Sequence, residues 1–175
     1  MKILRRIEEE FNEWNAPDYV INTFFLLFSF LFSTAVHELG HLVTALLLGC
    51  KAGILQLTLL QGATGFECAF DTGFSKILIA YGGGMAAFLF GLILWFSEGK
   101  KDMEKGELSE IRLLSIVMFL LSSVFQLFPG YRGLDGYKAI EFGLNPAIAW
   151  LVWLFLLSLV ANIVITERKY AVGSD

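Results

Sequence analysis

Charge is scarce in this sequence, and its distribution limits the class of protein. Of the 175 residues only 17% are charged and 56% are hydrophobic, a balance that excludes an intrinsically disordered chain. Four stretches lack charge altogether, and each approaches the roughly 20 residues that a helix needs to cross a bilayer: residues 19–36, 77–97, 113–131 and 142–166. We therefore expect an all-α, multi-pass integral membrane protein of about four transmembrane helices, placed in the cell membrane.

Other scarce features exclude further classes. Thirteen Lys and Arg against 17 Asp and Glu leave a net charge of −4, so no basic surface suggests nucleic acid as a partner. The two cysteines, Cys50 and Cys68, are too few for a disulfide framework and lack the spacing of a zinc knuckle. We expect them to be ordinary small residues. The basic start runs into Glu8, Glu9 and Glu10 instead of an apolar core, unlike a cleavable signal peptide.

Three parts are expected along the chain. Residues 1–18 form an N-terminal segment that lies on the membrane surface or packs on the bundle. Residues 19–167 form a single membrane-embedded domain, and residues 168–175 a polar C-terminal tail. The N-terminal segment is predicted to be an amphipathic helix, because four apolar residues share one stripe: Leu4, Ile7, Phe11 and Trp14.

Two segments interrupt the helical patterning. Residues 51–74 show alternating apolar and polar positions around a Gly-containing stretch, which predicts a short β-hairpin between the first and second membrane helices. Residues 128–136 break the third apolar run with one Pro and three Gly. Irregular backbone at that depth is tolerated where it lines a cavity. Between these segments, Gly82–Gly84 should allow close packing of the second helix.

The central motif is His37-Glu38-Leu39-Gly40-His41. On a helix, residues i and i+4 lie on one face, so both imidazoles can bind one zinc ion, with Glu38 beside a metal-activated water. The chain has no other histidine. A purely structural polar cluster is the alternative, but three ionisable side chains within hydrocarbon need a compensating partner, and a divalent cation provides one.

A catalytic zinc site normally has a third protein ligand. The acidic candidates on neighbouring loops are Glu67, Asp71, Asp135 and Glu141. Asp135 is the best of them, because it follows the Pro and Gly-rich break. If the helices alternate in direction, the end of the first helix, the hairpin and this break share one membrane face, so the motif and Asp135 can meet at similar depth.

These residues together resemble the site-2 protease family of intramembrane zinc metalloproteases. The resemblance rests on HELGH within a membrane helix, a following hairpin, a Gly-rich second helix and Leu134-Asp135-Gly136 after a Pro break. It implies that His37, His41 and Asp135 bind Zn²⁺ and that Glu38 is the catalytic base. It also implies cleavage of a transmembrane protein substrate in or near the lipid bilayer. The hairpin edge would then hold an unwound substrate strand, or the hairpin merely caps the bundle.

The sequence departs from the family at three places. Leu127 stands where the family usually has Asn, Gly83–Ala87 replaces Gly-Pro-x-x-Asn, and Tyr137 replaces the second Gly after the Asp. These departures concern substrate handling more than metal binding. They support, as an alternative, a catalytically weak or inactive relative that binds membrane helices as a regulator. A metal carrier is a third class, but it has no use for Glu38. Substrate recognition would come from the core or from a regulatory partner protein.

The side of the membrane that the motif faces is left open by the sequence. If the termini and residues 98–112 share one side, that side carries nine of the 13 Lys and Arg, and the other side carries four. The positive-inside rule then places both termini in the cytoplasm and the motif near the outer face. The family resemblance implies the reverse.

Overall fold

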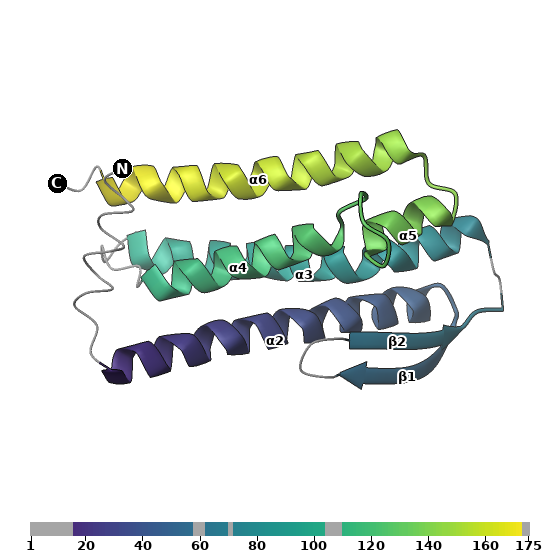
Figure 1. The fold of residues 1–175 in the computed structure, drawn as a ribbon, viewed down its shortest axis with the longest axis horizontal. Helices are drawn as coiled ribbons and strands as arrows, with labels where there is room; N and C mark the ends of the chain where they lie inside the picture. Colours follow the sequence, from purple (N-terminus) through teal and green to yellow (C-terminus); the bar gives the residue numbers. More distant parts are fainter. Residues whose placement is uncertain (1–15, 58–61, 70–71, 104–109, 173–175) are drawn as a thin grey trace.

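The computed structural model describes residues 16–57, 62–69, 72–103 and 110–172. The long helices lie side by side along a common direction (Figure 1). Most of the predicted N-terminal amphipathic segment falls outside the described residues. The elements follow one another in this order: α2 (Ala16–Leu47), β1 (Lys51–Leu57), β2 (Gly62–Glu67), α3 (Gly73–Met103), α4 (Glu110–Gln126), α5 (Asp135–Glu141) and α6 (Pro146–Val172).

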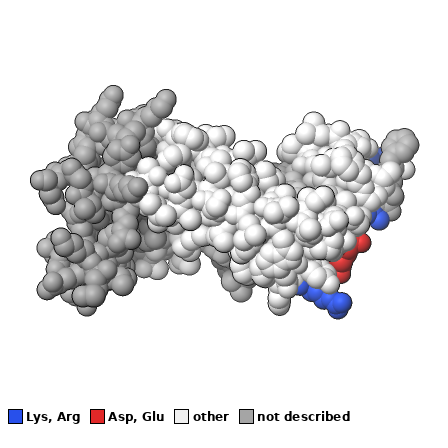
Figure 2. Space-filling model, turned by 90° about the horizontal axis from the view of Figure 1, so that it is seen from above, with Lys and Arg blue, Asp and Glu red and all other residues white. Residues whose placement is uncertain are grey.

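Within the described residues, three helices are long and apolar enough to cross a membrane: Thr23–Leu47 of α2, Gly73–Ser97 of α3 and Pro146–Thr166 of α6. Their outer surfaces carry large exposed apolar side chains, such as Leu47 at 82% and Leu151 at 66% exposure, which suit contact with lipid. Figure 2 shows the middle of one face free of charge, with the coloured charges gathered at one end. The apolar part of α4, Ser115–Gln126, is shorter, so the fourth span stays a prediction.

Small residues bring α2 and α3 into close contact, as the Gly run predicts. A Cβ built on Gly40 would lie 2.5 Å from the Ala86 Cβ, and one built on Gly82 would overlap the Thr44 side chain. Without side chains at these positions the two helix backbones approach closely. This packing fixes the depth of the α2 residues relative to those of α3.

The apolar core lies among α3, α4 and α6. Its buried members are Phe88, Ile116, Leu120, Val124, Leu127, Leu156, Val160 and Ile163. Trp153 of α6 donates a hydrogen bond from its Nε1 to the Val124 carbonyl at 3.0 Å, one of the carbonyls left without a helical partner where α4 ends. This hydrogen bond holds α6 against the break between α4 and α5. α6 also contacts α5 itself.

Two strands, β1 and β2, follow α2 and pair antiparallel, from Lys51 opposite Glu67 to Leu57 opposite Gly62, with an irregularity between Ala52 and Leu55. β2 begins within the Gly-containing stretch that the sequence pattern places between the strands. The ladder forms through the backbone, so the side-chain pattern does not report its exact limits. The hairpin lies beside the C-terminal half of α2 (Figure 1).

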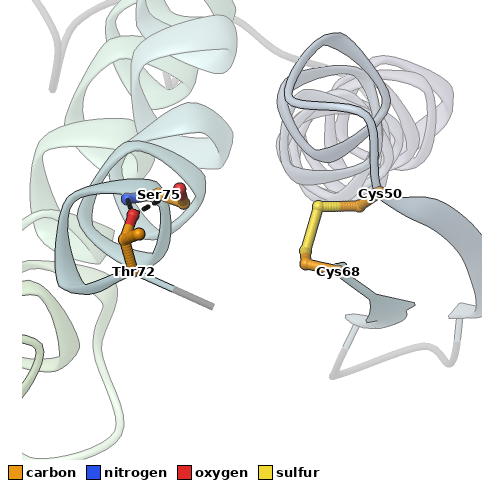
Figure 3. Close-up of a disulfide and its surroundings, with 4 residues drawn as sticks. All are labelled: Cys50, Cys68, Thr72 and Ser75. Carbon is orange, nitrogen blue, oxygen red and sulfur yellow. Dashed lines mark hydrogen bonds between the residues drawn. A yellow bond between two sulfur atoms is a disulfide. The ribbon is translucent and has the colours of Figure 1, made fainter. Parts of the chain in front are cut away.

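The expectation that Cys50 and Cys68 are ordinary small residues is wrong, because they form a disulfide (Figure 3). The hairpin register explains the pairing. Lys51 lies opposite Glu67, so the next residues outward on the two strands are Cys50 and Cys68. The bond ties the end of β2 to the end of α2. Nearby, α3 begins after Thr72, whose Oγ1 accepts a hydrogen bond from the Ser75 backbone N–H at 3.2 Å.

Candidate metal centre

His37 and His41 lie one turn apart on α2 and point to the same side of the helix. Their Nε2 atoms are 3.0 Å apart, and the two residues are only 6% and 9% exposed. The i, i+4 spacing therefore produces the shared face that the sequence predicts. Both rings lie inside the bundle, within the span Thr23–Leu47.

Asp135, which is distant from this pair in the sequence, lies beside it in the structure. Its Oδ2 is 2.8 Å from His37 Nε2 and 3.1 Å from His41 Nε2, and the residue is 3% exposed. It is the first residue of α5, directly after the Pro and Gly-rich break. Gly136 lets α5 begin this close to α4, because a Cβ there would overlap the Leu127 carbonyl.

The donor set fits a divalent cation. Two imidazole nitrogens and one carboxylate oxygen converge within 4.8 Å of one another. In a tetrahedral zinc site with bonds of roughly 2.0–2.2 Å, the ligand atoms are about 3.3 Å apart, so the cluster needs to open by only a few tenths of an ångström. One proton can bridge two of these atoms, whereas a cation satisfies all three.

The surroundings of the two rings differ. His41 donates a hydrogen bond from Nδ1 to the Ile79 carbonyl of α3 at 2.6 Å, which directs its Nε2 toward the cluster. Among the described residues, His37 Nδ1 has no hydrogen-bond partner. Gly83 of α3 lies against the His41 ring, since a Cβ on Gly83 would overlap it. His41 is thus the more firmly oriented of the two.

Asp135 lies in α5, outside the three apolar spans. Burial raises the pKa of its carboxyl, but hydrogen bonds from His37 and His41 and the charges of both rings outweigh burial and hold that pKa below its usual value. The carboxylate is therefore ionised at neutral pH, the form in which it binds metal.

Glu38 and the remaining acidic candidates occupy different surroundings. Glu38 is 7% exposed, and its carboxylate is close enough to His41 to interact with that ring electrostatically. Glu67 at the end of β2 and Glu141 at the end of α5 are exposed, and Asp71 falls outside the described residues. Within the described part of the chain, the cluster of potential metal-binding side chains is that of His37, His41 and Asp135.

Two of the three family departures, at Leu127 and in Gly83–Ala87, lie in the apolar packing beside this cluster. Leu127 is fully buried, and a Cβ on Gly84 would lie 2.5 Å from its Cγ. Ala87 is also fully buried. Leu127 and Gly84 are thus in contact with each other, and the Leu127 side chain occupies the space beside Gly84 between α3 and α4.

Sequence reasoning missed two groups that touch the cluster. The Ile79 carbonyl is a backbone atom and has no side-chain signature. Lys138 places its Nζ 3.2 Å from Asp135 Oδ1. Its spacing of three residues from Asp135 is informative only once a helix is recognised at residues 135–141.

Comparison with known families agrees with this geometry. The chain matches the family described as Peptidase M50B-like over residues 16–129, which include the histidine motif, the hairpin, α3 and α4 but end before Asp135. The comparisons with curated proteins and with solved structures gave no match. Because the family match covers more than half of the sequence, the chain belongs to the Peptidase M50B-like family, the family of the site-2 proteases.

Proposed function

We propose that the chain is an intramembrane zinc endopeptidase that hydrolyses peptide bonds of membrane-spanning substrates. The observation that carries this proposal is the convergence of His37, His41 and Asp135 inside an apolar helical bundle. Family membership supplies the reaction class. Burial of ionisable groups at this depth is costly, which favours a functional role for them.

Each residue has a distinct task under this proposal. His37, His41 and Asp135 hold the cation, and the Ile79 carbonyl fixes the tautomer of His41. Bound zinc supplies a Lewis acid that polarises the scissile carbonyl and lowers the pKa of a water molecule. Glu38, adjacent to His37 in sequence, accepts the proton of the attacking water and passes it to the leaving amine.

The apolar exterior supports a substrate that arrives through lipid. The spans that carry the site present exposed Leu and Phe side chains to their surroundings, so a transmembrane segment can approach without entering water. The proposed partners are therefore a transmembrane protein substrate and the bilayer, with a regulatory partner protein as a further candidate.

A second candidate is a weak or inactive relative that binds membrane helices as a regulator. It is favoured by the apolar, fully buried side chains of Leu127 and Ala87 at positions where the family resemblance places Asn. Retained metal without turnover would distinguish this candidate from the protease.

The deciding experiment uses the purified full-length protein in nanodiscs. Zinc content is measured by mass spectrometry of the metal, and cleavage is measured on a set of transmembrane peptides. We expect stoichiometric zinc in the wild type and in Glu38→Gln, with turnover abolished only in the latter. Asp135→Asn and His37→Ala should lose zinc and activity together.

Glu67→Gln and Glu141→Gln are matched controls, because both side chains are exposed and lie outside the cluster. Both should keep zinc and turnover. Equal cleavage by the wild type and Glu38→Gln would contradict the assigned base. Stoichiometric zinc without any turnover in the wild type would support the regulator instead.

A further inference from the structure

The two oxygens of Asp135 face different partners. Oδ2 points to both imidazoles, whereas Oδ1 receives a hydrogen bond from Lys138 Nζ at 3.2 Å. The Asp135 side chain is 5% exposed and that of Lys138 is 46% exposed. Lys138 therefore reaches the buried carboxylate from a partly exposed position one turn later on α5, at the oxygen that does not face the imidazoles.

We propose that Lys138 is a positioning residue that holds Asp135 with a single oxygen directed at the metal. A carboxylate with two free oxygens can rotate or bind a cation with both. Occupation of Oδ1 by the ammonium removes that freedom and leaves Oδ2 as the ligand atom, and hydrogen-bonded partners of this kind orient metal ligands. This inference rests on the proposed zinc site.

Electrostatic repulsion alone predicts the opposite effect of removing Lys138, so the sign of the change in zinc affinity separates the two explanations. An ammonium close to a dication repels it, so removal of the Lys138 charge by itself should strengthen zinc binding. A loss of affinity in Lys138→Met therefore points to a lost orientation of Asp135 and not to the lost charge. Lys138→Arg keeps a donor and a charge and should rescue the affinity.

The test is zinc affinity, measured by chelator competition on the full-length protein in nanodiscs. We expect about a tenfold loss for Lys138→Met, within the 10–100-fold range of such partners, and little change for Lys138→Arg. Lys76→Met is the matched charge control. The Lys76 ammonium lies over the ring of Phe142, the residue that follows α5, and Lys76 is not part of the cluster. It should bind zinc like the wild type.

Each outcome decides one question. Unchanged or tighter binding in Lys138→Met overturns the positioning role, as does an equal loss in Lys138→Arg or in Lys76→Met. A wild type that binds no zinc overturns the proposed function itself, which is a different result from wild-type binding that Lys138→Met leaves intact.

An independent observation concerns the side of the membrane. The Cys50–Cys68 disulfide lies at the same end of the bundle as the hairpin and α5. Disulfides form and persist in oxidising compartments and are rare in the cytosol. The opposite end, where α2 and α4 begin and α3 and α6 end (Figure 1), is flanked in sequence by nine of the 13 Lys and Arg.

We infer that the hairpin, α5 and the metal cluster face the non-cytoplasmic side, and that the opposite end of the bundle faces the cytoplasm. Redox chemistry and the positive-inside rule lead to this arrangement separately, and it is the reverse of the orientation that the family resemblance implies. The charge argument depends only on which helix ends lie together, so it holds whether or not α4 crosses the whole bilayer. Under the proposed function, the scissile bond then lies in the outer half of the membrane.

Labelling of intact cells with a membrane-impermeant maleimide tests this orientation without any need for activity. In a Cys50→Ser/Cys68→Ser background, Tyr131→Cys reports the site end, since Tyr131 is 65% exposed, and Lys101→Cys in the last turn of α3 reports the other end. We expect Tyr131→Cys to be labelled at once and Lys101→Cys only after permeabilisation. The reverse pattern, or free Cys50 and Cys68 thiols in wild-type protein extracted without reductant, overturns the inference.

Discussion

Gly83 lies directly against the imidazole of His41, and no side chain fits between them. A Cβ on Gly83 would overlap three ring atoms, among them Nε2, which belongs to the metal cluster. The ring cannot move away freely, because its Nδ1 is bonded to the Ile79 carbonyl. Gly83 is therefore as much a requirement of the cluster as of the α2–α3 packing.

Gly83→Ala should abolish zinc binding and turnover while the protein stays folded. Ala is a better helix former than Gly by about 1 kcal/mol, so a loss cannot come from weaker helix formation. It comes from the clash with His41, which displaces the ring or moves α2 away from α3. Bound zinc and circular dichroism are measured together. Gly91→Ala is the control, because its Cβ would crowd Leu120 in the apolar core, away from the cluster. Normal zinc in Gly83→Ala would contradict the contact.

Leu127→Asn, which restores the residue usual in the family, should destabilise this chain. Leu127 is fully buried against Gly84, and an amide in its place loses apolar packing and buries polar atoms without partners. The cost is about 2–4 kcal/mol. Thermal unfolding in detergent measures it. Gln126→Asn, at a half-buried position one residue earlier, should change stability little. A stable and more active Leu127→Asn would show that the pocket accommodates the amide.

Loss of the disulfide should loosen the hairpin and leave the metal cluster in place. The bond closes a loop with a sequence separation of 18, for which cross-linking stabilises by about 3 kcal/mol. Cys50→Ser and Cys68→Ser should be equally destabilised, and the double variant no more than either single one. Hydrogen exchange of β1 and β2 should accelerate while zinc content stays constant. Simultaneous zinc loss would show that the hairpin supports the cluster.

Proline in β1 tests whether the hairpin holds substrate. The sheet has two strands, β1 and β2, so the edge of β1 that faces away from β2 has no partner strand among the described residues and can pair with an extended peptide. Proline removes a backbone N–H donor. Substitution at each of residues 54–57 should lower cleavage at constant zinc content for those positions whose N–H points outward. Unaffected turnover across all four would leave the hairpin only its packing role.

The sequence was most informative where chemistry and periodicity coincide. The i, i+4 spacing of His37 and His41 produced the shared buried face, and the Pro and Gly-rich break correctly indicated where Asp135 could reach it. Long uncharged runs located α2, α3 and α6. These features are encoded locally, in residue type and spacing, so they can be recognised without knowledge of the packing.

Features that depend on contacts between distant segments were not recoverable in this way. The Cys50–Cys68 pairing follows from the hairpin register, which a count of cysteines ignores. α5 has only seven residues and too little periodicity to reveal a helix, so the approach of Lys138 to Asp135 was hidden. α3 continues to Met103, beyond the uncharged run of residues 77–97, because polar helix-forming residues can extend a helix beyond the bilayer.

The residues of the cluster are synthesised at different times, because they are far apart in the sequence. His41 and Asp135 are 94 positions apart in the chain. At translation rates of 5–20 residues per second, Asp135 is made about 5 to 20 seconds after His41. The histidine pair therefore enters the bilayer while its third partner does not yet exist. Under the proposed function, a nascent chain has no complete catalytic centre until the break after α4 has been synthesised, so neighbouring nascent membrane proteins are spared during that interval.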